Sequence, residues 1–243
     1  VFLRPLGLRL QGLIGRLGAN GKVHDLTVTG SVITTGKDAA GIVGQAKTKT
    51  TILNCLNRAD VTAASSAAGV VGLAGGMVSK AAAAKNAPAI TGCGNTGTIT
   101  ATDEAGCAGG VASVASMFLA RGGVMKDCFN VGTVTGAGKS GAVTNTSNKQ
   151  KQADGGGNYF LAGCLHGSGD EPIIGTGKTA DELMEMLKDR TDSVGKGLYE
   201  ALHAIKDQAA ADAVIEKIAA IGAVTLDSKN AIDAAQAAYD ALT

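Results

Sequence analysis

The stretch ITGCGNTGTIT, residues 90–100, decides the fold, because three other parts of the chain repeat its pattern. The related stretches VHDLTVTGSVI, ILNCLNRADVT and MKDCFNVGTVT start at residues 23, 52 and 125. The aligned copies share an apolar column three residues before the cysteine position and a β-branched column six residues after it. These columns are Val23, Ile52, Ile90 and Met125, and then Val32, Val61, Ile99 and Val134. An internal repeat of this kind predicts similar units that stack on one another.

Three further columns lie between these two. The cysteine column consists of Leu26, Cys55, Cys93 and Cys128. The asparagine column consists of Asn57, Asn95 and Asn130. The small-residue column consists of Gly30, Ala59, Gly97 and Gly132. The first copy has Val28 in place of an asparagine. We expect the cysteines to point inward as small apolar side chains, and the asparagines to hydrogen-bond from one repeat to the next. Glycine reaches positive φ at little cost, so the small column is expected to turn a corner of each repeat.

A second block, AAGIVG, AAGVVG, AGGVAS or SGAVTN, follows each copy. The cysteine positions are 29, 38 and 35 residues apart, which indicates constant strands joined by variable loops. Val134 lies between Thr133 and Thr135, an alternation that indicates a strand with one buried face. Because one repeat cannot bury that face alone, we predict a mainly β fold. It is a right-handed parallel β-solenoid of about four to five coils over residues 1–178, with a C-terminal α-helical segment.

The segment GAGKSG, residues 136–141, resembles a phosphate-binding loop, but its first glycine would fall on Thr133 and no helical period follows it. We interpret it as a turn between two strands. Turns of the other repeats align with it and give a row of charged residues, the weak candidate binding edge, made of Lys37, Asp38, Asp103, Glu104 and Lys139. Solvated turns are the simpler interpretation of this row, and no aromatic residue flanks it to stack on a sugar.

The net charge of +1 provides no overall field for nucleic acid, and no segment is apolar enough to predict a membrane span. The five cysteines form no C-x-x-C pair and the three histidines lie in separate segments, so we predict no metal site and no cofactor. Parallel side chains disfavour the disulfide dihedral, so the column cysteines are expected to be free thiols. Cys107 and Cys164 lie off the column, and the sequence assigns them no role.

The pattern changes after residue 178. Residues 179–182, TADE, are typical of a capping box, and helices are expected over 179–188, 207–221 and 229–241. We expect residues 179–205 to cap and connect the last coil, with the helix over 179–188 as the cap. Residues 206–243 are expected to form a partial helical bundle, in which Val214, Ile218 and Ile221 are docked rather than free.

The pattern G-[LIV]-V-G followed by I-x-N/D-C-x-N-x-G-x-[VI]-T resembles the GLUG repeat of bacterial surface proteins over about residues 12–178. GGGNYFLAG, residues 155–163, looks like the segment that closes such arrays, and residues 206–243 are similar to FIVAR-type spacers of Gram-positive wall proteins. The resemblance implies an extracellular location on the bacterial cell surface, and we expect the chain to be a fragment of a longer protein.

These observations predict a non-catalytic structural or adhesive module of a secreted, wall-associated bacterial protein. It would be monomeric and serve as a stalk or as a weak binder of host glycans or surface proteins. The alternative is a β-helix scaffold of a carbohydrate-active enzyme, or an accessory region of an extracellular protease. Neighbouring sequence would discriminate the two, since a wall-sorting motif favours the stalk and an H-E-x-x-H motif favours the protease.

Overall fold

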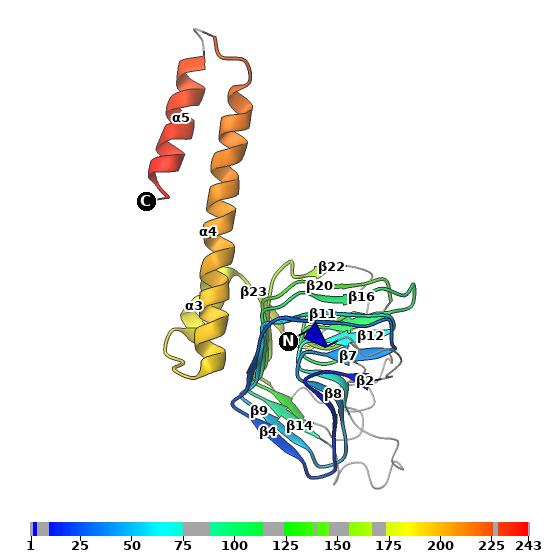
Figure 1. The fold of residues 1–243 in the computed structure, drawn as a ribbon. Coiled ribbons are helices and arrows are strands. Elements are labelled where there is room, and N and C mark those ends of the chain that lie inside the picture. Colours follow the sequence, from blue (N-terminus) through cyan, green and yellow to red (C-terminus); the bar gives the residue numbers. More distant parts are fainter. Residues whose placement is uncertain are drawn as a thin grey trace. The chain divides into compact units, whose positions relative to one another are not determined.

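The computed structural model describes residues 2–3, 10–74, 88–113, 124–138, 140–145, 156–166, 174–225 and 228–242. Within these ranges the chain forms five β-sheets followed by three helices (Figure 1). Every pairing between the named strands is parallel. None of the sheets closes on itself within the described ranges. The prediction of a mainly β fold with parallel sheets and a C-terminal helical segment is therefore confirmed.

In each sheet the neighbouring strands come from successive repeats, and sheets A and E have six strands each. Sheet A consists of β1 (Phe2–Leu3), β6 (Ser31–Ile33), β11 (Asp60–Ala63), β16 (Ile99–Ala101), β20 (Val134–Gly136) and β22 (Leu165–His166). Sheet E consists of β5 (Thr27–Val28), β10 (Leu56–Asn57), β15 (Gly94–Asn95), β19 (Phe129–Asn130), β21 (Tyr159–Leu161) and β23 (Thr176–Lys178).

The other three sheets are built in the same order. Sheet B consists of β2 (Leu10–Gln11), β7 (Asp38–Ala40), β12 (Ser66–Ala68) and β17 (Cys107–Gly109). Sheet C consists of β3 (Ile14–Leu17), β8 (Val43–Ala46) and β13 (Val71–Ala74). Sheet D consists of β4 (Lys22–His24), β9 (Thr51–Leu53), β14 (Ala89–Thr91) and β18 (Val124–Lys126).

The strands pair in the register that the aligned sequence columns predict. In sheet A, Val61 pairs with Val32 on one side and with Ile99 on the other. The apolar column pairs in the same way in sheet D. Because a slip by one residue would turn these side chains outward, the buried columns fix the register. The interior contains two apolar clusters, one around the cysteine column and one between sheets A and B.

The corners of the repeats differ from the expectation. Of the small column, Gly30 has positive φ (110°), but Gly97 and Gly132 do not. Gly97 and Gly132 are needed for another reason, because a Cβ on either would overlap the carbonyl oxygen of the preceding repeat. The corner is turned one residue before the cysteine column, by Asp25, Asn54, Gly92 and Asp127, with φ of 52°, 49°, 65° and 53°. Asp, Asn and Gly are the residues that tolerate this conformation best.

The helices are α3 (Ala180–Leu187), α4 (Ser193–Ile221) and α5 (Lys229–Asp240). The predicted capping box is confirmed, since Thr179 Oγ1 accepts from the Glu182 amide and Glu182 Oε2 accepts from the Thr179 amide. The helix expected over 207–221 begins earlier, so one continuous helix crosses the boundary expected at residue 206. The chain divides into two compact units, Val1–Tyr199 and Glu200–Thr243.

The second unit holds the stripe that was expected to be docked. Val214 is 5% exposed, but Ile218 is 53% exposed, so the stripe is only partly buried. Ala235 of α5 is buried, whereas Tyr239 lies exposed. Among the described residues of the second unit, the buried apolar side chains are Leu202, Val214 and Ala235.

In the first unit, the start of α4 lies on the outer face of sheet E. A Cβ placed on Gly94 would lie 2.9 Å from Val194 Cγ1 and 3.2 Å from Leu198 Cδ1. Gly197 in turn allows Leu56 to approach the helix backbone closely. Val194 and Leu198 are fully buried as a result. The contacts of α4 thus lie along a flank of the stacked repeats, rather than over the last repeat as expected for residues 179–205.

A substitution of Gly69 tests the packing of the interior. In Gly69→Ala the new Cβ would lie 2.6 Å from Asn95 Oδ1, and it would also overlap the Gly110 carbonyl oxygen. We expect the free energy of unfolding to fall by about 1–3 kcal/mol, because buried backbone atoms cannot move aside. Gly18→Ala is the matched control, since nothing lies within 4 Å of its Cβ, and it should change stability by less than about 0.5 kcal/mol. Urea unfolding of both variants checks this, and equal midpoints would contradict the packing argument.

Candidate functional site

The expected asparagine ladder is present in the structure. Asn57 Nδ2 donates to Asn95 Oδ1 at 2.7 Å, and Asn95 Nδ2 donates to Asn130 Oδ1 at 2.7 Å. Each amide also donates to the carbonyl oxygen two residues later, at 2.8–2.9 Å. All three side chains are fully buried. Both amide hydrogens of each asparagine are therefore used, which removes the large cost of burying an unpaired donor.

The last asparagine meets a cysteine that the sequence could not assign. Asn130 Nδ2 donates to Cys164 Sγ at 3.4 Å, so Cys164 ends the ladder. Burial raises the pKa of the Cys164 thiol to about 11, although the bond from Asn130 opposes this. Cys164 therefore stays protonated and neutral beside the amide.

The cysteine column contains free thiols, as expected: Cys55, Cys93 and Cys128 are reduced and fully buried. Each thiol donates to the carbonyl oxygen two residues earlier, at 3.3–3.4 Å. Burial raises the pKa of the Cys93 thiol well above its usual range. The hydrogen bond from Cys93 lowers the pKa of the Cys55 thiol to about 7, but no reagent reaches it in the folded chain. This column is structural packing rather than a reactive site.

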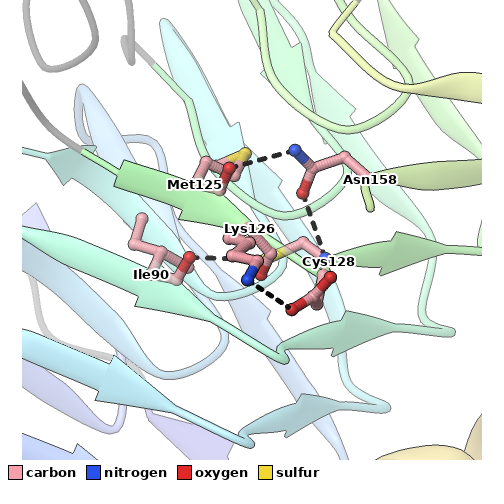
Figure 2. Close-up of polar contacts among 6 residues, drawn as sticks. Ile90, Met125, Lys126, Cys128 and Asn158 are labelled. Atoms are coloured by element: carbon pink, nitrogen blue, oxygen red, sulfur yellow. Dashed lines mark hydrogen bonds and ion pairs between the residues drawn. The ribbon is translucent and has the colours of Figure 1, made fainter. Parts of the chain in front are cut away.

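Asn158 closes the edge of sheet D after the last strand, β18. Its Oδ1 accepts from the Cys128 amide at 3.0 Å, and its Nδ2 donates to the Met125 carbonyl oxygen at 3.0 Å (Figure 2). One side-chain amide thus replaces the backbone groups of a further strand. Phe160 and Ile174 add apolar cover to the same end of the core. These residues supply the described contacts at this edge of sheet D, and the capping role expected for the helix over 179–188 stays a prediction.

The described residues of the weak candidate binding edge lie in neighbouring turns, but the third repeat departs from the expected register. Asp38 of β7 pairs with Ser66, and Ser66 pairs with Cys107, so Cys107 takes the place expected for Asp103 or Glu104. The third repeat has a longer turn, closed by the bond from the Gly106 amide to the Asp103 carbonyl oxygen.

Asp103 does lie beside the preceding turn, where its Oδ2 accepts from Ser65 Oγ at 3.0 Å. Lys37 and Glu104 are exposed, and burial raises the pKa of Asp38 while Lys37 opposes this. Lys139 lies outside the described residues. Lys37, Asp103 and Glu104 are thus solvated turn residues, whereas Asp38 is a half-buried residue of β7.

The described part of the GAGKSG segment forms a strand end and a stacked turn. The Gly138 amide donates to the Gly106 carbonyl oxygen at 2.8 Å, and Ser140 Oγ accepts from the Ala108 amide at 3.0 Å. Ser140 is buried, so its hydroxyl is part of the contact between repeats. The prediction of a turn rather than a phosphate loop agrees with these bonds.

A cavity of about 410 Å3, which the sequence analysis missed, lies in the first unit. Its lining side chains come from the corners of three repeats, the outer face of sheet E and the α3–α4 connection. They include Asn54, Thr91, Asp127, Phe129, Tyr159 and Arg190. The Asp, Asn and Gly residues just before the cysteine column were the available sequence signal for this cavity, but the same residue types are typical of ordinary turns. Arg190 lies 60 residues after Asn130, so the repeat pattern does not predict its position beside the cavity.

Two further features bear on chemistry. Among the described residues, no three His, Cys, Asp or Glu side chains lie close enough together to hold a metal ion. None of the described helices is long and apolar enough to cross a membrane. Comparison with protein-family models, curated proteins and solved structures found no match for this chain.

Replacing Asn95 tests the ladder through pH. In Asn95→Asp a carboxylate would face Asn130 Oδ1 and the Gly97 carbonyl oxygen, two acceptors to which Asn95 now donates. Burial would raise the folded-state pKa of this Asp above its unfolded value near 3.9, so its contribution is most favourable at low pH and is lost as pH rises. We expect a loss of about 3–5 kcal/mol at neutral pH, and a smaller loss near pH 4.

Asn95→Ala is the control, because it removes the amide without adding a charge. It should lose about 1–3 kcal/mol, equally at both pH values. Chemical unfolding of both variants at the two pH values measures this. If Asn95→Asp loses the same amount at both, the ladder is not the buried, donor-dependent contact described above.

Alkylation of the thiols tests the cysteine assignments. Cys107 is partly exposed, whereas the other four cysteines are buried. Mass spectrometry after treatment with iodoacetamide should therefore find Cys107 modified in the folded chain, and all five cysteines modified in urea. Modification of Cys55 at the rate of Cys107 without denaturant would show that the pKa of Cys55, and not its burial, governs reactivity.

Proposed function

We propose that the five parallel sheets are the faces of a right-handed parallel β-solenoid of about four to five coils. Support comes from the strand order, because in every sheet the neighbouring strands come from successive repeats. The asparagine column gives the same support, since Asn57, Asn95 and Asn130 are register partners. Connections between parallel strands are almost always right-handed, which favours this hand.

We propose further that this solenoid is a non-catalytic structural and adhesive module. The observation that carries the proposal is the asparagine ladder. The columns that recur in the sequence are used inside the molecule, where they hold one repeat to the next, so packing alone explains their recurrence. On the weak candidate binding edge, the third repeat departs from the expected register, because Cys107 and not Glu104 pairs with Ser66. This departure favours the structural function over the enzyme scaffold.

The resemblance to GLUG repeats and FIVAR spacers supplies the proposed setting. The chain would be a monomeric fragment of a secreted, wall-associated protein of a bacterium, with host glycans or surface proteins as partners. Buried thiols suit this setting, because an oxidising medium does not reach them. The partly exposed Cys107 is the exception.

An array of host glycans and extracellular proteins, combined with product analysis, tests this function. The purified chain should bind reversibly to members of one class and release no sugar or peptide product. The enzyme alternative predicts product formation that is lost in the double variant Asp38→Asn, Asp103→Asn. Asp25→Asn is the control, because it keeps a residue that tolerates positive φ and lies away from that edge. Product loss specific to the double variant would overturn the proposal.

A further inference from the structure

Two glycines of the corner column line the cavity. Asn54, Gly92, Asp127 and Gly157 occupy this corner in successive repeats, all with positive φ. A Cβ on Gly92 would overlap Asn54 Oδ1, and a Cβ on Gly157 would overlap Asp127 Oδ1. The Asn54 amide and the Asp127 carboxylate therefore each lie over the glycine of the following repeat, in the room that its missing side chain leaves.

The outer face of sheet E supplies an aromatic wall. The rings of Phe129 and Tyr159 lie in neighbouring strands, with centroids 5.6 Å apart and planes at 36°. Arg190 Cζ lies 5.5 Å from the Phe129 centroid and covers that ring. Phe129 is only 6% exposed, whereas Tyr159 is half-buried. Tyr159 is therefore the ring that a ligand can contact.

The charges that line the cavity are already balanced. Arg190 Nε and Nη2 donate to the two carboxylate oxygens of Asp192, at 3.0 and 3.2 Å. Lys126 Nζ lies 3.8 Å from Asp127 Oδ2. A strongly charged ligand would have to disrupt one of these pairs, so the cavity favours a neutral one. The available groups include an amide and hydroxyls, which donate and accept hydrogen bonds, and a carboxylate, which accepts them.

We propose that this cavity binds a neutral sugar residue, which rests on the adhesive function proposed above and assigns it a site. A pyranose offers hydroxyl groups that donate and accept, together with an apolar C–H face for the Tyr159 ring. The volume of about 410 Å3 lies in the range of small-ligand sites. Asn54 and Asp127 bind the hydroxyl groups, and Tyr159 packs against the ring.

Gly92→Asn tests the site, because it gives this repeat the same residue type as its neighbour. Asn tolerates the φ of 65°. The new Cβ would overlap Asn54 Oδ1, so the added side chain displaces the flexible Asn54 amide and narrows the cavity. Gly163→Asn is the matched control, since Gly163 also has positive φ (86°) but nothing within 4 Å and no place in the cavity lining. Thermal unfolding checks that both variants remain folded.

The measurement is ligand-observed NMR on the full chain with the methyl glycosides of glucose, galactose, mannose, N-acetylglucosamine and sialic acid. We expect millimolar binding of a neutral glycoside, weakened about tenfold or more in Gly92→Asn and unchanged in Gly163→Asn. Absence of binding to every neutral glycoside, or preference for sialic acid, overturns this inference and leaves the structural role intact. Equal binding by Gly92→Asn and the unmodified chain also overturns it, and leaves an adhesive function located elsewhere.

Discussion

Each asparagine of the ladder requires a glycine opposite it. A Cβ on Gly41 would overlap the Asn57 amide, and Gly69 and Gly110 stand in the same relation to Asn95 and Asn130. The two recurring blocks of the sequence are thus one structural unit, although they lie far apart in each repeat. The asparagine block supplies hydrogen bonds along the stack, and the glycine block lets the opposite backbone approach closely. Since Gly41 separates Ala39 of one apolar cluster from Ile42 of the other, the ladder lies between the two clusters.

A ladder of amides leaves unpaired groups at its ends, and the chain solves this with different residues. Val28 occupies the asparagine position of the first repeat, so that repeat adds no further amide. At the other end a neutral thiol, Cys164, accepts the last hydrogen bond. The backbone edge of sheet D has the same problem, and there Asn158 binds one donor and one acceptor. Because open strand edges recruit other chains, these end contacts matter for solubility as well as for stability.

The sequence predicts the strands and their register well, because buried columns of Val, Ile and Met leave one alignment that keeps them inside. It predicts less about corners and surfaces. Gly97 and Gly132 were expected to have positive φ, but glycine is required there because neighbouring repeats approach closely. Both causes require glycine, so the sequence does not distinguish them. The early start of α4 was missed because Gly195 and Gly197 weaken its helical pattern. Gly197 is tolerated there because Leu56 packs against it, a contact between residues 141 positions apart.

A regular stack of repeats presents the same surface at every level, so a distinct site must come from departures from the repeat. In the corner column, Gly92 and Gly157 interrupt a row that otherwise carries Asp25, Asn54 and Asp127. On the outer face of sheet E, the position held by Leu56 and Gly94 becomes Phe129 and then Tyr159. Both departures adjoin the same cavity. The residues that agree between repeats therefore account for the fold, and those that disagree locate the part of the surface able to recognise a ligand.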